Sequence, residues 1–575
     1  MILQALVEYY EALAEKGEVV RPGYSLAKIS FALSIDEDGS LLDVIDLREE
    51  AEQGKGKKKV LHPRQLQVPE QKKRQGTKPP PYLLCDNSKY FLGIDAKTAP
   101  EESQIRFEAA KDLHIRTFGS SETAAARALC AFFRNWDPAT AEQHPALQEY
   151  KDEILAGGNL IFRFRGGWLQ DAPELRKLWL NKEKADEEEI QMRCLVTGEY
   201  GPVAKLHPAF KGVRGAQSTG ASLVSFNAPA FESYEREQGY NAPVSHYAAF
   251  AYGTALNYLL ADYEHVKQLG DTTLVFWAKS GEKAYQDLFT MGMDSLDEDL
   301  EQNLHFAMSA LAKGKSVPWE SVELQPDEHF YILGLSPNAG RISVRFFLRD
   351  SFGSFMRNIQ SHEERLEIDK YKEERDKLSP WWILQETVNP KAKDKKPLPQ
   401  LAGDYLRSIL LGKPYPNTLY INILLRIQAE RKINYRKAAV IKAFLIKNYR
   451  EEISVKLDRE CRNIAYVLGR LFSVLEEIQK AANPDINTTI QDKYFTSAGS
   501  TPSRVFPTLL DLANKHLRKL KGETGKHIYL EKRLSEIMNL LEEDFPDLLS
   551  LKDKGIFQIG YYHQKQARYS KKEDK

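Results

Sequence analysis

Apolar positions near the start of the chain follow first a helical spacing and then the spacing of strands. Residues 2–16 carry apolar side chains three and four positions apart, and Gly17 follows them, which predicts a helix that stops at this glycine. Residues 29–35 and 41–47 are apolar runs separated by turn-forming residues at 36–40, which predicts two strands joined by a turn. The chain therefore opens with a helix and a strand pair.

The middle of the chain mixes both spacings. Three segments have apolar residues at helical spacing: 100–115, 121–135 and 246–268. Strand-like apolar runs occupy four segments: 159–165, 271–277, 330–335 and 342–348. This part is predicted to combine helices with β-strands.

From residue 403 onward the pattern is almost wholly helical, with apolar residues three and four positions apart and Lys and Arg on the other faces. The predicted helices cover 403–412, 417–431, 434–449, 453–481, 504–520 and 525–543. This spacing predicts a basic helical bundle.

These patterns predict an α+β multidomain protein, in which a mixed N-terminal and central region is followed by an α-helical bundle at the C-terminus. A chain of 575 residues is too long for one compact core. Changes in composition suggest an N-terminal region at 1–190, a Gly-rich and central region at 191–360, a charged linker at 361–402 and the bundle at 403–575.

The composition favours a folded protein of the cytoplasm. Apolar residues make up 42% and charged residues 28%, which allows a buried interior. The four cysteines are scattered and form no CxxC pair, as is usual in a reducing compartment. No apolar run is long enough to span a membrane, and the first residues lack the basic region of a signal peptide. We expect no membrane partner, cofactor or metal.

A formal net charge of zero hides an uneven distribution of charge. Residues 401–575 carry 31 Lys and Arg against 21 Asp and Glu, an excess of +10, which leaves −10 for residues 1–400. A second basic segment, residues 53–82, contains nine Lys and Arg residues and only one acid, Glu70. Because basic side chains that neutralise phosphates release condensed counterions, both regions are candidates for contact with a nucleic-acid backbone.

The basic segment 53–82 also contains several prolines, which exclude a helix or a central strand and predict an exposed loop. A solvated run of charge is the plain alternative. The cations proposed to contact phosphate are Lys57, Lys58, Lys72, Lys73, Arg74 and Lys78. Amide side chains that could reach base edges are Gln65, Gln67, Gln71, Gln75 and Asn87.

Three aromatic residues in the predicted strand at 159–165, or just after it, suggest two roles. Phe162, Phe164 and Trp168 are interleaved with Arg163 and Arg165, a pattern that can stack nucleotides. In an alternating strand such residues more often belong to the core. The core interpretation is therefore preferred.

The Gly-rich segment around residues 212–222 imitates two catalytic motifs. Its glycine spacing resembles a phosphate-binding loop, but Ala221 occupies the position of the required lysine. Ser218 lies in an Ala-x-Ser-x-Gly sequence that resembles a serine nucleophile elbow, although the flanking residues do not predict the strand and helix that an elbow needs. Cys194 and His207 supply only two of the four ligands of a closed zinc site, so a buried structural pair is the simpler interpretation.

A longer block identifies a family resemblance. It contains Cys194-Leu-Val-Thr-Gly-Glu199, Leu206-His-Pro208, the run that begins Lys211-Gly-Val-Arg-Gly-Ala-Gln-Ser-Thr-Gly220, and Thr254-Ala-Leu-Asn-Tyr258. This block closely resembles the Csd-type CRISPR-associated family, the large subunit of the type I-C (Dvulg subtype) Cascade. The first ten residues and the segment Gly560-Tyr-Tyr-His-Gln-Lys565 also resemble the ends of that family.

The resemblance implies a non-catalytic subunit that recognises the protospacer-adjacent motif in double-stranded DNA, supports R-loop formation and recruits the helicase-nuclease in antiviral defence. It implies a CRISPR RNA, the Cascade backbone subunits, the 5′-handle subunit and small subunits made from an internal start within the same gene. Combined with side-chain chemistry, it suggests phosphate contacts by Lys211 and Arg214 and polar contacts by Gln217, Ser218 and Asn227.

Three alternatives remain open at this stage. The glycines of the block could serve only packing rather than close approach to DNA. The chain could be a serine hydrolase or nuclease with Ser218 as nucleophile, or a free-standing RNA-binding protein.

Overall fold

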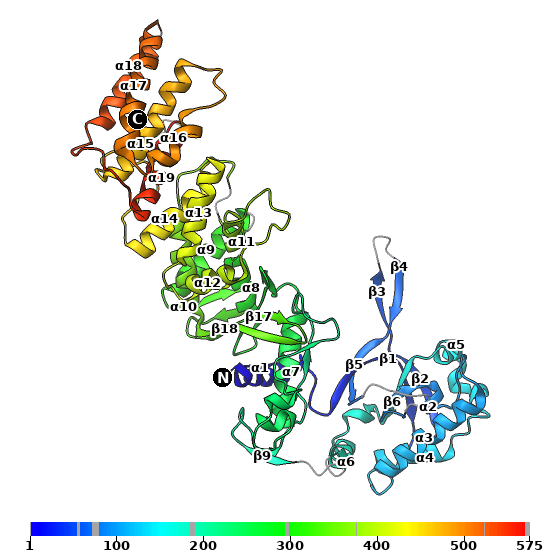
Figure 1. The fold of residues 1–575 in the computed structure, drawn as a ribbon. Helices are drawn as coiled ribbons and strands as arrows, with labels where there is room; N and C mark the ends of the chain where they lie inside the picture. Colours follow the sequence, from blue (N-terminus) through cyan, green and yellow to red (C-terminus); the bar gives the residue numbers. More distant parts are fainter. Residues whose placement is uncertain are drawn as a thin grey trace. The chain divides into compact units, whose positions relative to one another are not determined.

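A computed structural model describes residues 2–53, 58–71, 80–183, 190–293, 298–374, 377–522 and 524–569 (Figure 1). Contacts divide the chain into two compact units. The N-terminal unit comprises Tyr10–Leu206 and Phe226–Ala255, and the C-terminal unit comprises Met1–Tyr9, His207–Ser225 and Leu256–Lys575. Neither unit is one continuous stretch, so their limits differ from the four consecutive segments expected from composition, which reports only local change along the chain.

The predicted opening helix is confirmed as α1 (Ile2–Glu15), and its residues are divided between the two units. Within the C-terminal unit the ring of Tyr9 lies 6.0 Å from that of Trp277, centroid to centroid. Within the N-terminal unit the ring of Tyr10 meets that of Phe250 edge to face at 5.8 Å. The consecutive residues Tyr9 and Tyr10 therefore pack against aromatic rings that belong to different units.

The N-terminal unit is built on a sheet with the order β2-β1-β7-β6, in which β5 also pairs with β1 and β8 with β7. The strands are β1 (Tyr24–Ile35), β2 (Leu41–Asp46), β5 (Arg64–Pro69), β6 (Cys85–Asn87), β7 (Asn159–Phe164) and β8 (Gly167–Trp168). The pair β1 and β7 is parallel, and the others are antiparallel. The predicted strands at 29–35, 41–47 and 159–165 are confirmed.

Both faces of this sheet are buried. Phe31 and Phe162 face a large aromatic core, whereas Ile29 and Ile161 face a smaller apolar cluster. The helices of the unit are α2 (Ser88–Phe91), α3 (Pro100–Phe118), α4 (Ala124–Asn135), α5 (Lys151–Leu155) and α6 (Pro173–Glu183). The two helices predicted over 100–115 and 121–135 are therefore confirmed as α3 and α4, and both supply buried side chains to the aromatic core.

The basic segment 53–82 departs from the loop that was expected. Residues Glu49–Gln53 and Lys58–His62 pair as the hairpin β3–β4, and Arg64–Pro69 forms β5 against β1. The prolines do not prevent this pairing, because Pro63 lies between two strands and Pro69 ends β5. The expectation of a loop is thus wrong for residues 58–62 and 64–69.

The remainder of the N-terminal unit contains the short antiparallel pair β9 (Gln191–Arg193) and β10 (Tyr200–Pro202). It also contains most of α7 (His246–Ala261), which continues into the C-terminal unit. The predicted helix at 246–268 is too long, since α7 stops at Ala261 and residues 267–269 form a strand.

The C-terminal unit contains a second sheet with the order β11-β12-β18-β17-β14-β13. Its strands are β11 (Ala209–Phe210), β12 (Ala221–Ser222), β13 (Lys267–Leu269), β14 (Thr272–Ala278), β17 (His329–Asn338) and β18 (Arg341–Ser351). A separate short pair joins β15 (Val317–Trp319) to β16 (Val322–Leu324). The strands predicted at 271–277, 330–335 and 342–348 are confirmed by β14, β17 and β18.

Helices complete this unit and account for the regular secondary structure that is described after residue 398 (Figure 1). They are α8 (Lys283–Met293), α9 (Glu298–Ala312), α10 (Phe352–Leu366), α11 (Pro380–Gln385), α12 (Pro399–Leu410), α13 (Asn417–Glu430), α14 (Tyr435–Tyr449), α15 (Ile464–Ala482), α16 (Ile490–Ala498), α17 (Pro502–Lys519), α18 (Thr524–Met538) and α19 (Leu551–Gln566). The predicted α+β class with a helical C-terminal region is confirmed.

Two expectations for this part need correction. Residues 453–463 are not helical, because Asn463 caps α15 by accepting hydrogen bonds from the backbone N–H groups of Ala465 and Tyr466. Residues 361–402 are not simply a charged linker, since Ile368 and Ile383 are buried in the same apolar core as the bundle. Among the described residues, no helix is both long enough and apolar enough to cross a membrane.

Candidate nucleic-acid interface

The Gly-rich loop, defined as residues 211–220, joins β11 to β12 at one edge of the sheet of the C-terminal unit. Strand β12 pairs with β11 on one side and meets β18 through Ser222, whose backbone N–H donates to the carbonyl of Gly340 at 3.1 Å. The loop therefore emerges between two short strands that fix both of its ends.

The glycines of this loop are required by the chain's own packing. Gly212 has φ +94°, and a Cβ atom there would lie 3.0 Å from the carbonyl oxygen of Leu260. Gly220 has φ +113°, and its Cβ would lie 3.0 Å from the Cβ of Ala209. Both positions combine a left-handed backbone with close neighbours, which only glycine accommodates without strain. These contacts support the interpretation that the two glycines serve packing against neighbouring residues of the same chain.

Hydrogen bonds hold the loop backbone while its polar side chains stay exposed. The backbone N–H of Lys211 donates to Asn257 Oδ1 at 3.4 Å, and that of Arg214 donates to Thr273 Oγ1 at 3.2 Å. Val213 is buried between them. The structure brings four predicted site residues together on this exposed loop: Lys211, Arg214, Gln217 and Ser218. A rigid backbone with exposed cationic and hydrogen-bonding groups can hold a phosphate and present polar groups to base edges.

The other predicted site residues are not part of this loop. Asn227 is exposed but belongs to the N-terminal unit. Lys58 lies in β4, and its side chain is not among those the structure describes. The remaining candidates fall outside the described residues: Lys57, Lys72, Lys73, Arg74 and Lys78.

The surroundings of Ser218 differ from those of a serine nucleophile. An elbow connects a strand to a helix, whereas Ser218 lies between two antiparallel strands. In the part of the chain that the structure describes, no histidine is hydrogen-bonded to its hydroxyl. A phosphate-binding loop needs a helix at the same place, and β12 stands there instead.

Cys194 behaves as a buried structural group. Its side chain belongs to the N-terminal unit, and its sulfur accepts backbone hydrogen bonds from Val196 and Thr197 at 3.4 Å and from Ser245 at 3.2 Å. Burial acts to raise the pKa of this thiol, but hydrogen bonds from Ser245 and Thr197 outweigh it and lower the pKa to about 7. Across the described ranges, no three His, Cys, Asp or Glu side chains are grouped as a metal site would require.

The aromatic strand belongs to the core. Phe162 and Phe164 are both buried, and Phe162 packs 4.8 Å from Phe91, centroid to centroid. Nucleotide stacking on these two rings is therefore excluded by burial. Trp168 is half-buried, and the guanidinium of Arg163 lies 5.6 Å from its ring centroid.

The comparison with known families agrees with this outline. The model of the family described as CRISPR-associated protein (Cas_Csd1) matches residues 6–569. The chain belongs to this family. It is thus a Cascade-type CRISPR-associated protein. No curated protein matches the chain.

In this Csd1 family member, only part of the basic excess in the bundle is available for phosphate. Lys437, Lys442 and Arg470 are buried, and their charged groups bind internal partners such as Glu430, the Arg365 carbonyl and Gln564 Oε1. By contrast, α17 exposes four cations: Arg504, Lys515, Arg518 and Lys519. The phosphate-binding prediction for the bundle is best carried by α17.

One group of cations in this Csd1 protein was missed by the sequence analysis. Arg21, Arg176 and Lys177 line one cleft of the N-terminal unit, although Arg21 is far from the other two in the sequence. Of the residues that line this cleft, the sequence suggests a nucleic-acid contact only for Gln67, whose amide could reach base edges. No spacing pattern links residues brought together by folding.

Proposed function

We propose that the chain is the large, non-catalytic subunit of a type I-C Cascade complex of the cytoplasm. In this role it recognises the protospacer-adjacent motif in double-stranded DNA, supports R-loop formation and recruits the helicase-nuclease. Its partners are the CRISPR RNA, the backbone and 5′-handle subunits, and small subunits made from an internal start. Guide pairing supplies most of the sequence specificity, and the protein reads the short motif.

The observation that carries this proposal is the Gly-rich loop of a CRISPR-associated family member. Its backbone is fixed by Asn257, Thr273 and Gly340, while Lys211, Arg214 and Gln217 remain exposed. A fixed loop with an arginine and a glutamine suits a groove contact, because arginine recognises phosphate or guanine and glutamine recognises adenine. The exposed cations of α17 suit contact with the nucleic-acid backbone.

The first test compares the complex with and without this subunit. Without it, the complex should keep its guide RNA but lose affinity for a duplex that carries the motif, measured by fluorescence anisotropy. Unchanged duplex affinity would contradict the proposal. Duplexes with and without the motif separate motif reading from general DNA binding.

The second test concerns Arg214. In the assembled complex, Arg214→Glu should weaken binding of the motif duplex tenfold or more. It should also reduce the slope of log K against log salt by about 0.9 for each phosphate that is no longer neutralised. Lys313→Glu is the matched control, because Lys313 is an exposed cation of the same unit outside the loop. An unaltered slope would reject Arg214 as a phosphate-binding residue.

The competing enzymatic function is tested at Ser218. We expect that Ser218→Ala does not alter any hydrolytic activity of the complex. If this variant abolished a hydrolytic activity while DNA binding and interference both survived, the non-catalytic role would be wrong. If the isolated chain bound single-stranded RNA tightly but added nothing to duplex binding by the complex, a free-standing RNA-binding role would replace it.

A further inference from the structure

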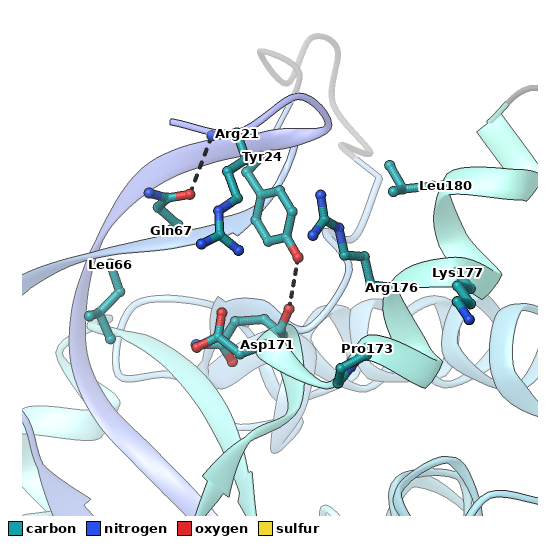
Figure 2. A pocket seen from close by; sticks show the side chains of 10 residues that line it. Arg21, Tyr24, Leu66, Gln67, Asp171, Pro173, Arg176, Lys177 and Leu180 are labelled. Carbon is teal, nitrogen blue, oxygen red and sulfur yellow. Dashed lines mark hydrogen bonds between the residues drawn. The ribbon is translucent and has the colours of Figure 1, made fainter. Parts of the chain in front are cut away.

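A cleft of about 710 Å³ opens on the N-terminal unit and contains no residue of the Gly-rich loop (Figure 2). Its walls come from the start of β1, from β5, from the short 3-10 helix Leu169–Asp171 and from the first turns of α6. The polar residues that matter here are Arg21, Tyr24, Gln67, Asp171, Arg176 and Lys177.

The cleft carries a net positive charge. Figure 2 shows the guanidinium groups of Arg21 and Arg176 on either side of the Tyr24 ring, and that of Arg176 lies 5.4 Å from the ring centroid. Within the described residues, none of Arg21, Arg176 and Lys177 forms an ion pair. Three cations therefore share the cleft with one carboxylate, Asp171. Such a group attracts an anion and can hold a phosphate.

The cleft is formed before any ligand binds. The Tyr24 hydroxyl donates to the Gln170 carbonyl at 3.2 Å, and its buried ring packs edge to face against Trp179 at 5.6 Å. Gln67 Oε1 accepts the backbone N–H of Arg21 at 3.3 Å, while Gln67 Nε2 donates to the Val19 carbonyl at 3.3 Å. These bonds hold the backbone of Arg21 at one wall. A preformed site loses less entropy when it binds its ligand.

One acceptor distinguishes this cleft from a simple anion site. The exposed Asp171 carboxylate lines the cleft and would repel a bare anion. Cations beside an acceptor suit a ligand that carries both a phosphate and hydrogen-bond donors. A nucleotide has both, since its sugar hydroxyls and base N–H groups are donors.

The start of α6 adds to this arrangement. Pro173 begins the helix and also lines the cleft, so the positive end of the helix dipole lies at the same wall. Arg176 and Lys177 follow within the first turns. The helix thus contributes the positive end of its dipole and two cationic side chains to the same wall of the cleft.

We propose that this cleft binds one nucleotide of a single-stranded nucleic acid. Its phosphate is held by Arg21, Arg176 and Lys177, and its sugar or base donors meet Asp171. This site is separate from the Gly-rich loop that reads the duplex. The inference rests on the proposed function only for the source of the strand, which is either the guide RNA or displaced DNA.

The test uses the full chain and three labelled probes: rU10, dT10 and a duplex carrying the motif. The double variant Arg176→Glu/Lys177→Glu should weaken binding of one or both single strands at least tenfold and leave the duplex unaffected. The slope of log K against log salt should fall by about 1.4 if two phosphates are no longer neutralised, at about 0.7 each. Lys97→Glu/Arg127→Glu is the control, because both cations are exposed in the same unit and neither lines the cleft.

The outcomes separate the possible sources. Loss of rU10 binding alone identifies RNA as the strand, loss of dT10 binding alone identifies DNA, and loss of both identifies a site that accepts either. Unchanged binding of both single strands in a folded double variant overturns the proposal. Failure of the Arg214→Glu test on the duplex would not affect these results, so the two proposals can fail independently.

A second variant tests whether the ligand is a nucleotide or only an anion. Uridine 5′-monophosphate should displace the bound strand at a lower concentration than inorganic phosphate. Asp171→Asn should bring the two displacing concentrations, of nucleotide and of inorganic phosphate, closer together. Because Asp171 is exposed, this substitution is not expected to disturb folding. If inorganic phosphate competes as well as the nucleotide against the unaltered chain, the nucleotide assignment is wrong.

Discussion

Buried histidines lie in both units and are held in their neutral form. In the N-terminal unit, His114 Nδ1 lies 2.7 Å from the Ala110 carbonyl, and Nε2 accepts the backbone N–H of Leu84 at 3.0 Å. Burial lowers the pKa of His114 to about 4, with the Ala110 carbonyl opposing the shift. In the C-terminal unit, burial and the nearby Arg365 lower the pKa of His362 to about 3. Both rings therefore act as uncharged polar groups of the core.

Because these buried histidines stay neutral in the folded chain, we expect the protein to lose stability in weak acid. The unfolded chain takes up a proton on His114 below its ordinary pKa of 6.5, whereas the folded chain does so only near pH 4. Its contribution to stability is complete above pH 6.5 and decreases as the pH falls towards 4, by about 3 kcal/mol for this residue. Urea unfolding across this pH range should record the decrease.

The matched substitutions are His114→Gln and His305→Gln, since His305 is exposed. The first should lower stability at pH 7.5 and flatten its dependence on pH, because the titrating group is gone. The second should leave the dependence unaltered. If His114→Gln showed the same pH dependence as the unaltered chain, burial of this ring would not explain the acid sensitivity.

At the scale of single elements, most of the helices and strands that local patterns predicted are confirmed, but many of the shorter strands were not predicted. Residues 159–164 form a short run rich in apolar and aromatic residues, and residues 502–519 have a strong apolar stripe, so β7 and α17 could be expected from the local sequence alone. By contrast, α19 is buried on nearly every side, so its sequence lacks the contrast that marks a surface helix. Strand β5 was missed because it depends on pairing with β1, which is a long-range contact.

The candidate sites also differ in whether they depend on local sequence or on long-range contacts. Exposure of Lys211 and Arg214 was predictable because a glycine-rich segment has few ways to bury charge. The cleft around Arg176 could not be predicted, because β1, β5 and α6 form it only after folding. The spacing of residues within one segment does not show which distant segments will lie together.

The crossing of α15 and α19 depends on two glycines and gives an element-scale prediction. A Cβ atom at Gly560 would lie 2.1 Å from the Tyr466 carbonyl oxygen, and one at Gly469 would lie 2.0 Å from that of Phe557. Since these neighbours are backbone atoms, the helices must separate to accept a methyl group. Gly560→Ala should therefore destabilise the C-terminal unit by about 2 kcal/mol, measured by urea unfolding.

Gly403→Ala is the control for this prediction. Gly403 lies within α12, and a Cβ there would have no neighbour within 4 Å. The substitution should stabilise the unit by about 0.5–1 kcal/mol, because alanine restricts the unfolded chain and favours the helix. Equal destabilisation by both substitutions would show that close helix contact is not the cause.

At the scale of the whole molecule, the helical bundle is not independent of the segment that precedes it. The Tyr562 hydroxyl donates to the Asp369 carbonyl at 2.8 Å, and the backbone N–H of Asp369 donates to the Val455 carbonyl at 2.9 Å. Lys442 is 2% exposed and donates to the Arg365 carbonyl at 3.2 Å. Residues 365–369 thus satisfy polar groups of the bundle.

This dependence predicts that a fragment of residues 399–575 is less stable than one of residues 352–575. The shorter fragment leaves the Lys442 ammonium group without its carbonyl partner, and burial already lowers the pKa of that group despite the opposing charge of Glu367. Its Tm should be lower by several degrees, since about 1 kcal/mol corresponds to 2–4 °C at this size. Thermal unfolding followed by circular dichroism gives the comparison.

Lys442→Met separates this cause from a general effect of truncation. It should raise the Tm of the shorter fragment, because an unpaired buried cation is removed, and have less effect on the longer one. If Lys442→Met changed both fragments equally, loss of the Arg365 carbonyl would not account for the difference.

Helix α1 has a consequence for the order of synthesis. Residues 2–9 leave the ribosome well before Trp277, which packs against Tyr9, is added. At usual elongation rates of about 5–20 residues per second, the interval is between about 13 and 54 s. During that time the N-terminal unit can acquire nearly all its residues, while Leu6 and Tyr9 still lack their final neighbours. The two units are therefore expected to mature in sequence, and residues 2–9 are among the last parts to be completed.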